Sequence, residues 1–489
     1  MRRLIPAIAA ALLLPAAALA QVATPSIYAS GQPEPSSPRD LGMLVTYRTA
    51  TPNLSTALFP TNASGQSNTR RQLPIANLID PTCIKRLRVV LPAWHQKSTA
   101  PAEENVGAGV TSHNALERVW NDGTPVEITW GGAATLTYVP GTTHFSDAIV
   151  GPFTSRTLGW RSYQTWPSGT LVSGSAPLYA ARGEYVNGGG TRTDATMVAG
   201  NPGQAPGNGF GYGPLGGVAH VSGTCSVPHA LAIFGDSIVR AAGDNGTFAN
   251  GGDPATGLAG YLERALGGDY PVVNVGQFGS QWSNLATNAQ AGRNTALLPF
   301  VDRIVVELGT NEATGNVTTW RQRALDAWLV LRSIHPSAKM AQFTITPQVS
   351  LKSGATVYAP ANQDNTTTGG GRFVVGGSVD LGNEWLRDGA PFDTATKAVA
   401  EIGATGATIA RVGAAGHPLN LVVDVAGFVT TGRNTNIWRD GLLYSAAWAG
   451  DGIHPSDDGH AAIAAWLRAL PAWQAFLAGR FEPMRVITR

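Results

Sequence analysis

The chain has 489 residues, of which 43% are hydrophobic and 13% charged, a balance that suits a globular protein with a large core. Its formal net charge is +2, and the first twenty residues hold two arginines and no acidic residue, so the remainder of the chain is neutral. A neutral chain lacks the basic surface that nucleic-acid binding needs, and its length predicts two domains.

Residues 5–20 form an apolar run behind Arg2 and Arg3, and the run ends in a small-x-small pattern at residues 18–20. This arrangement is typical of a cleaved secretory signal peptide. A membrane anchor is the weaker alternative, because the run is short and Pro15 interrupts it. We expect residues 1–20 to be a signal peptide, and the mature chain to be secreted or periplasmic without a membrane span.

The two cysteines, Cys83 and Cys225, would share an oxidising compartment after export, where a disulfide between them is expected. Two buried free thiols are the alternative. The sequence has no CxxC and no HExxH motif, so it gives no metal signature, and no cofactor is expected.

The first half of the mature chain predicts loops followed by short strands. Residues 21–80 are rich in Pro, Ser, Thr and Asn and are expected to be extended. Residues 81–200 are expected to form a β-rich, sandwich-like accessory domain, because short β-type runs recur between turn residues. The expected elements are strands at 87–91, 126–130 and 134–139 and a helix at 112–119.

Tryptophans and glycines are frequent in this half. The tryptophans are more typical of a sandwich core than of platforms for sugar rings; they are Trp94, Trp120, Trp130, Trp160 and Trp166. Residues 201–227 are dense in glycine, without the strand, helix and Lys-Ser/Thr pair of a phosphate loop. This segment is expected to be a linker between the domains.

Strands alternate with helices over residues 228–489, which predicts a parallel sheet with helices on both faces. The expected strands are 230–234, 272–275, 303–308, 338–346 and 421–425. The expected helices start after Asp253, span 320–333 and start near Ser456. A long irregular insertion at about 348–418 is expected to shape the substrate pocket, with its loop tip at 365–371.

Polar residues and glycines follow the strands of this second half. Ser237 comes directly after the first strand, and a serine becomes a nucleophile only when a base takes its proton. Asp451 and His454, three residues apart, could supply that base. Gly279 follows the second strand and Asn311 the third, and both could donate hydrogen bonds to the oxyanion that acyl transfer develops.

These blocks resemble those of the SGNH hydrolases, also called the GDSL esterase/lipase family. The matching residues are Phe234-Gly235-Asp236-Ser237, Asn274-Val275-Gly276-Gln277-Phe278-Gly279, Gly309-Thr310-Asn311-Glu312 and Asp451-Gly452-Ile453-His454-Pro455. The resemblance covers about residues 228–477 and implies a flavodoxin-like three-layer α/β/α sandwich. Ile238 stands where the family has leucine, and Glu312 where it has aspartate; the second departure bears on how the Asn311 turn is held.

By this resemblance Ser237 is the nucleophile, His454 the general base and Asp451 the residue that orients the base. The oxyanion hole is implied to consist of the Ser237 N–H, Gly279 and Asn311. Asp236 is expected only to fix its turn by accepting from backbone N–H groups. Two other histidines, His417 and His460, are expected to be structural.

The function that the resemblance implies is a secreted serine esterase that cleaves carboxylic esters through an acyl-serine. O-acetyl groups on carbohydrate are the first expectation for its substrate. A general short-chain or aryl esterase or lipase is one alternative, and a non-catalytic polysaccharide-binding protein is another. Trp282, Trp438 and Tyr444 are candidate substrate contacts, with simple packing as their alternative.

Overall fold

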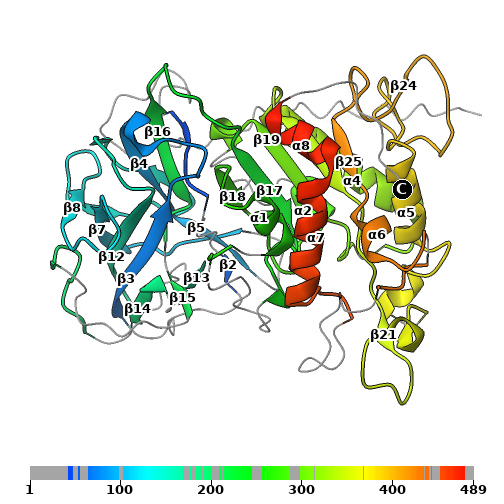
Figure 1. The fold of residues 1–489 in the computed structure, drawn as a ribbon, viewed down its shortest axis with the longest axis horizontal. Helices are drawn as coiled ribbons and strands as arrows, with labels where there is room; N and C mark the ends of the chain where they lie inside the picture. Colours follow the sequence, from blue (N-terminus) through cyan, green and yellow to red (C-terminus); the bar gives the residue numbers. More distant parts are fainter. Residues whose placement is uncertain are drawn as a thin grey trace, which may run out of the picture.

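The structure, a computed structural model, describes part of the chain. The described residues are 42–47, 53–54, 64–97, 103–168, 176–178, 182–188, 191–199, 209–211, 213–244, 256–258, 260–286, 298–312, 314–366, 368–433, 435–439, 442 and 452–479. Asp451, Tyr444 and the expected signal peptide lie outside them. Two halves lie side by side, one built of β-strands and one of strands and helices (Figure 1).

Two antiparallel sheets form the N-terminal half. The strands of the first are β1 (Met43–Leu44), β4 (Ile84–Pro92), β10 (Thr143–Phe145), β11 (Ile149–Val150) and β16 (Gly216–Val221). The strands of the second are β3 (Gly65–Pro74), β7 (Thr111–Glu117), β8 (Pro125–Ile128), β9 (Thr135–Thr137), β12 (Thr157–Trp166) and β14 (Tyr185–Gly188). Their spatial orders are β1-β16-β4-β10 and β14-β3-β12-β7-β8, with β11 also beside β4 and β9 also beside β7.

The two sheets share one apolar core. Val89 and Leu91 of β4 belong to the same buried cluster as Leu158 and Trp160 of β12. Shorter pairings complete this half; they involve β2 (Asn53–Leu54), β5 (Trp94–Lys97), β6 (Glu103–Asn105), β13 (Ala176–Leu178) and β15 (Gly209–Gly211). A β-rich half built of packed antiparallel sheets agrees with the expected architecture.

Three expectations for this half were wrong. The helix expected at 112–119 is the strand β7, because pairing with β12 and β8 overrides its local helix propensity. The extended segment at 21–80 contains β3, a ten-residue strand whose buried residues are mostly polar, so that no apolar alternation marks it.

The segment expected to be a linker, 201–227, contains β16, which lies between β1 and β4. The glycines of β16 allow neighbouring side chains to pack closely against the strand. A Cβ at Gly216 would lie 2.9 Å from Leu44, and a Cβ at Gly217 would lie 2.9 Å from Leu87.

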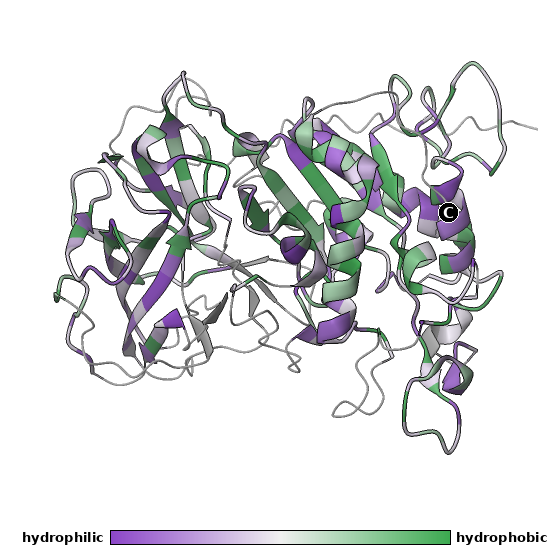
Figure 2. Ribbon diagram, in the orientation of Figure 1, coloured by the Kyte–Doolittle hydropathy of each residue, from purple (hydrophilic) through white to green (hydrophobic). Residues whose placement is uncertain are grey.

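A parallel sheet forms the centre of the C-terminal half. Its strands are β17 (Leu231–Gly235), β18 (Val272–Asn274), β19 (Arg303–Glu307), β20 (Lys339–Phe343) and β25 (Leu421–Val423). They lie in the order β18-β17-β19-β20-β25, and every neighbouring pair is parallel. Figure 2 shows hydrophobic residues along these strands.

Helices cover both faces of this sheet. Leu231 and Ile233 of β17 pack with α1 (Gly260–Leu266), α7 (Asp457–Ala469) and α8 (Pro471–Ala478). Ala232 and Phe234, which point to the opposite face, pack with α2 (Trp282–Ala286), α4 (Val317–Ile334) and α5 (Ser378–Arg387). The three-layer α/β/α arrangement therefore agrees with the expectation, and α7 crosses the front of the sheet in Figure 1.

The insertion at 348–418 is more regular than expected, since it contains the helix α5. Short strands accompany this helix: β21 (Ser350–Leu351), β22 (Gln363–Asp364), β23 (Phe392–Asp393) and β24 (Ile409–Ala410). A further helix, α6 (Val425–Val429), follows β25. The helix expected after Asp253 begins at Gly260, and Asp253 itself lies outside the described residues.

The two halves share apolar contacts and a backbone hydrogen bond, and a disulfide closes the β half. Trp94 and Leu215 belong to the same buried cluster as Phe300 of the α/β half. The N–H of Val272 donates to the Thr46 carbonyl at 2.9 Å, which joins the parallel sheet to the β half. Within the β half a disulfide joins Cys83 to Cys225, the pair that the sequence suggested, with 6.1 Å between the Cα atoms.

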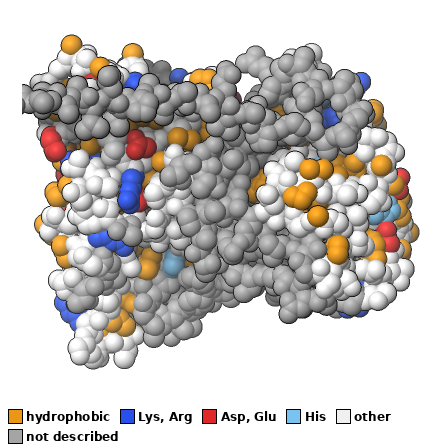
Figure 3. Space-filling view, turned by 180° about the vertical axis from the view of Figure 1, so that it is seen from behind, with side chains coloured by type: hydrophobic (Ala, Val, Ile, Leu, Met, Phe, Trp, Pro, Cys, Tyr) orange, Lys and Arg blue, Asp and Glu red, His pale blue; other side chains and the backbone are white. Residues whose placement is uncertain are grey.

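No single helix of the described residues is long and apolar enough to cross a membrane, although α7 and α8, bent by 72°, pass that test when they are counted as a pair. Basic and acidic side chains on the face drawn in Figure 3 are scattered rather than grouped by sign.

Candidate active site

Ser237 lies in the turn that follows β17, at the carboxyl edge of the parallel sheet. The chain reverses so tightly here that a Cβ on Gly235 would lie 2.3 Å from the Val239 side chain, so only glycine fits. The Ile238 N–H donates to Asp236 Oδ1 at 2.9 Å, which fixes the turn as the sequence predicted. Ser237 is 7% exposed, so little of its surface is open to solvent.

His454 reaches the same point from a position 217 residues later in the chain. Its Nε2 lies 2.7 Å from Ser237 Oγ, within hydrogen-bond distance. Two contacts hold the His454 loop: Ser456 caps the start of α7 by accepting from the Gly459 N–H at 3.0 Å, and Val349 donates to the Gly452 carbonyl at 3.0 Å. The serine and histidine predicted from the sequence are therefore in contact, whereas Asp451 lies outside the described residues.

Asn311 follows β19 and lies beside the Ser237 turn. Its Nδ2 donates to Asp236 Oδ2 at 3.2 Å and to the Ser280 carbonyl at 3.4 Å. Because a carboxylate oxygen can only accept, Asp236 holds the amide with its NH2 group towards the turn that carries Ser237. This second role of Asp236 was not predicted.

Gly279 lies in the neighbouring turn, after β18, with φ of +71°. Glycine is the residue that adopts such a conformation without strain. Gln281 in the same turn donates from Nε2 to the Asn311 carbonyl at 2.7 Å, so the turns that carry Gly279 and Asn311 are in direct contact. The structure thus brings Ser237, Asn311 and the Gly279 turn to one edge of the sheet.

Two buried carboxyl groups lie beneath this edge. Asp236 and Glu307 are both fully buried, and Gly235 of β17 pairs with Glu307 of β19. Burial raises the pKa of Asp236, and the Ile238 N–H and His454 partly oppose that rise. Glu307 has no hydrogen-bond partner on either oxygen, and burial, reinforced by the charge of Asp236, raises its pKa well above the ordinary value.

Burial and the neighbouring charge of Asp236 therefore both favour the protonated form of Glu307, whereas the hydrogen bonds that Asp236 accepts from Ile238 and Asn311 favour its charged form. The sequence contained a signal for this group: Glu307 interrupts the apolar run at 304–308. The sequence predicted Glu307 only as one residue of the strand at 303–308, and its place beneath Ser237 was not predicted.

The candidate substrate contacts are not borne out where the structure describes them. Trp282 and Trp438 are completely buried. Trp282 packs edge-on against Trp320 with ring centroids 4.3 Å apart, and Trp438 donates from Nε1 to the Pro347 carbonyl at 3.0 Å. Both are core residues, and Tyr444 lies outside the described residues.

His417 and His460 are structural, as expected. Burial lowers the pKa of His417 to about 4 and that of His460 to about 3, so both rings are neutral at pH 7. His460 Nδ1 accepts from the Tyr261 N–H at 3.1 Å and thereby connects α7 to α1.

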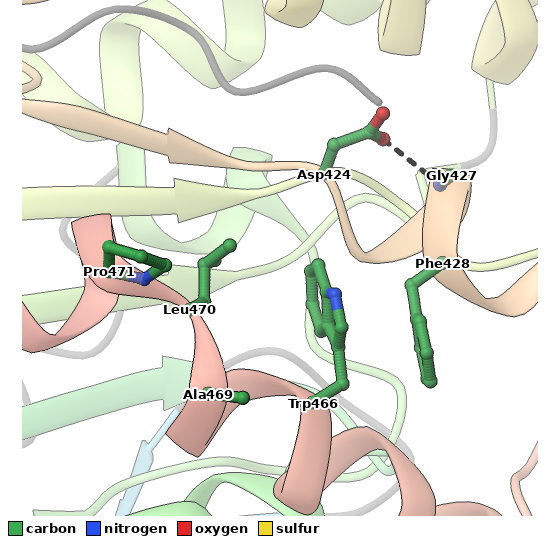
Figure 4. A pocket seen from close by; sticks show the side chains of 7 residues that line it. All are labelled: Asp424, Gly427, Phe428, Trp466, Ala469, Leu470 and Pro471. Carbon is green, nitrogen blue, oxygen red and sulfur yellow. Dashed lines mark hydrogen bonds between the residues drawn. The ribbon is translucent and has the colours of Figure 1, made fainter.

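An apolar pocket of about 260 Å³ lies elsewhere, between α6 and the corner of α7 and α8 (Figure 4). Phe428 and Trp466 stack at its wall with ring centroids 4.8 Å apart. Its one carboxylate, Asp424, already accepts from Arg387 and from the Gly427 N–H. Among the described residues that line the pocket, there is therefore no free reactive group. Among the described residues, no three His, Cys, Asp or Glu side chains converge as metal ligands.

No protein-family model and no curated protein matches the chain. Solved structures similar to it include the lipase/acylhydrolase from Enterococcus faecalis, at 16% identity over 53% of this chain and 99% of that one, with a TM-score of 0.29. Another is a family two carbohydrate esterase from Clostridium thermocellum in complex with cellohexaose, at 13% identity over 88% and 97%, with a TM-score of 0.27. A third is a peptidoglycan O-acetylesterase, at 11% identity over 87% and 81%, with a TM-score of 0.29. Similarities at this level leave the function to be inferred from the residues around Ser237.

Proposed function

We propose that the protein is a serine hydrolase that cleaves carboxylic esters through an acyl-serine intermediate. The observation that carries this proposal is the 2.7 Å contact between Ser237 Oγ and His454 Nε2. A hydroxyl in contact with an imidazole nitrogen, at the carboxyl edge of a parallel sheet, is the arrangement that nucleophilic catalysis needs.

In the first half of the reaction, Ser237 Oγ attacks the ester carbonyl while His454 Nε2 takes the hydroxyl proton. The carbonyl oxygen becomes negatively charged and accepts hydrogen bonds from the Ser237 N–H, the Gly279 N–H and Asn311 Nδ2, whose second N–H leaves the longer bond of 3.4 Å to the Ser280 carbonyl. The tetrahedral intermediate then collapses, the alcohol leaves with the proton from His454, and the acyl group stays on Ser237.

In the second half, water attacks the acyl-serine while His454 takes one of its protons. Collapse of the second intermediate releases the carboxylic acid and returns the proton to Ser237. We assign Asp451 the task of orienting His454, on the strength of its place three residues before the histidine. Asp236 keeps the Asn311 amide oriented in both halves of the reaction, because Asp236 Oδ2 accepts a hydrogen bond from Asn311 Nδ2.

For the substrate we propose O-acetyl groups on carbohydrate. The 7% exposure of Ser237 and 5% exposure of His454 favour a short acyl group over a long chain. We also propose export of the mature chain, since residues 1–20 have the pattern of a signal peptide and the Cys83–Cys225 disulfide suits an oxidising compartment.

The experiment that tests the reaction compares the wild type, Ser237→Ala and Ser337→Ala on p-nitrophenyl acetate and on acetylated polysaccharides. Ser337 is an exposed serine and serves as the matched control. We expect Ser237→Ala to lose at least about a thousandfold in kcat with an unchanged melting temperature, and Ser337→Ala to keep wild-type activity.

Acetate release from polysaccharide that depends on Ser237 would support the carbohydrate substrate. Ser237-dependent cleavage of the small ester alone would point to a general esterase. Turnover that persists in Ser237→Ala would rule out the proposed nucleophile, and polysaccharide binding without hydrolysis would indicate a binding protein.

A further inference from the structure

Glu312 is a side chain that the proposed reaction does not use, and it joins the turn that carries Asn311 to the chain just after Gly279. It follows Asn311 directly and is completely buried. We infer that Glu312 is a positioning residue, whose carboxylate holds the Gly279 turn against the Asn311 turn and so sets the geometry of the oxyanion hole. This inference rests on the proposed esterase function.

The carboxylate of Glu312 reaches from its own turn to the start of α2. Its Oε2 accepts from the N–H of Trp282, the first residue of α2, at 3.0 Å. Trp282 lies three residues after Gly279, so this hydrogen bond fixes the chain directly behind the glycine. The main-chain N–H of Gly279 therefore depends for its position on a side chain from the neighbouring turn.

The other carboxylate oxygen is held from outside the two turns. Glu312 Oε1 accepts from Arg323 Nη1 of α4 at 2.5 Å. Since a buried carboxylate needs polar partners, the bond from Arg323 compensates for the burial of one oxygen of Glu312 while the other oxygen accepts from the Trp282 N–H.

Arg372, which belongs to the insertion, binds the main chain on both sides of Asn311. Its guanidinium donates to the Thr310 carbonyl at 3.3 Å and also to the Glu312 carbonyl. Both residues that flank Asn311 are therefore held, one on each side. Together with the Gln281 bond to the Asn311 carbonyl, these contacts make the two turns a single rigid unit.

Side-chain length matters for this role. An aspartate at position 312 would draw the carboxylate back by about 1.5 Å, one carbon–carbon bond, and could not reach both Trp282 and Arg323. Oxyanion donors act only when they are fixed in place before the charge develops, and displacements of this size are costly to the rate. The glutamate that departs from the family pattern is thus the residue that the geometry requires.

The test measures Glu312→Asp and Glu312→Gln against a matched control, Asp424→Asn. Asp424 makes the same two kinds of contact as Glu312, but at a position away from Ser237. It accepts from the Gly427 N–H at 3.0 Å at the start of α6 and pairs with the buried Arg387. Removing its charge should lower the melting temperature about as much as the Glu312 changes do. It should leave the oxyanion hole intact.

Two readouts separate positioning from stability. The first is kcat and KM on p-nitrophenyl acetate; the second is the rate at which a fluorophosphonate labels Ser237, since the phosphonyl oxygen occupies the same hole as the oxyanion. We expect Glu312→Asp to lose at least about tenfold in kcat and in labelling rate with KM nearly unchanged. Glu312→Gln should lose less, because its amide oxygen can still accept from Trp282, and Asp424→Asn should match the wild type.

Equal labelling rates and kcat in the wild type and both Glu312 variants would overturn the inference. Losses of the same size in Asp424→Asn would overturn it as well, because they would show a general effect of stability. If the wild type itself is neither labelled nor active, the proposed function fails, and this outcome is distinct from failure of the Glu312 role alone.

Discussion

Two buried glutamates, one in each half of the molecule, have their pKa values shifted in opposite directions. Glu117 of β7 is completely buried in the β half, where Arg70 pairs with it through two hydrogen bonds of 2.7 Å and Arg161 through a third. Burial raises the pKa of Glu117, but the hydrogen bonds from Arg70 and Arg161 outweigh it and leave the pKa below its ordinary value. Glu307 is equally buried but has no hydrogen-bond partner, and burial together with the charge of Asp236 raises its pKa.

The difference shows that burial alone does not decide the charge of a carboxyl group. In the β half the charge is kept and neutralised by two guanidinium groups, which orders three strands around it. Beneath Ser237 burial and the charge of Asp236 raise the pKa of Glu307, while Asp236 accepts hydrogen bonds from Ile238 and Asn311.

The strongest test of this comparison removes the charge of Glu117. We expect Glu117→Gln to lower the free energy of unfolding by about 3–5 kcal/mol, because Arg70 and Arg161 would remain buried with too little compensation. Urea denaturation measures the loss. Glu401→Gln is the control, since Glu401 pairs with the buried Arg321 but is itself 79% exposed, and it should cost far less. Equal losses in the two variants would contradict the comparison.

The second test concerns pH and Glu307. Above the ordinary pKa of 4.5 the unfolded chain releases this proton while the folded chain retains it, so folding loses stability as the pH rises. Glu307→Gln removes that dependence, and its melting temperature should rise relative to the wild type as the pH increases from the ordinary pKa of 4.5 towards the raised pKa of Glu307. The expected slope is up to about 1.4 kcal/mol per pH unit. A difference that is constant across this range would mean that Glu307 is ionised in the fold.

The smallest effect is expected at the surface of the β half. His113 lies between Asp194 at 2.6 Å and Glu127 at 3.0 Å; burial lowers its pKa, and these two carboxylates outweigh burial and raise it. Its stabilisation is complete below pH 6.5 and disappears as the pH rises through the raised pKa. Because water screens the pairs, His113→Gln should cost under about 1 kcal/mol at pH 5.5 and nothing at pH 9. A loss that is equal at both pH values would exclude an ionic origin.

Much of the α/β half could be predicted from the sequence, because each of its strands is an apolar run followed by a residue that marks its end. The run at 230–234 located β17, and the turn after it identified Ser237. Ser456 marked the start of α7. His454 could be assigned because it follows Asp451 by three residues, in a block that resembles the motif of the SGNH hydrolases.

The β half was harder because its signals are non-local. The residues of β3 are buried but polar, and their ladder with β12 is what makes them a strand. The glycines of β16 have the composition of a linker, and only the neighbouring Leu44 and Leu87 reveal why they are small. The prediction that Trp282 and Trp438 contact the substrate was wrong for the same reason, since the sequence around a tryptophan does not show which elements enclose it.

The apolar cluster that runs from Trp94 and Leu215 to Phe300 bears on how separable the two halves are. A chain cut in front of β17 would leave Phe300 and its neighbours facing water, and the Val272 N–H without the Thr46 carbonyl. The α/β half on its own would then expose an apolar patch, and exposed apolar patches favour aggregation. The N-terminal half therefore covers apolar surface of the α/β half and supplies an acceptor for one of its backbone N–H groups.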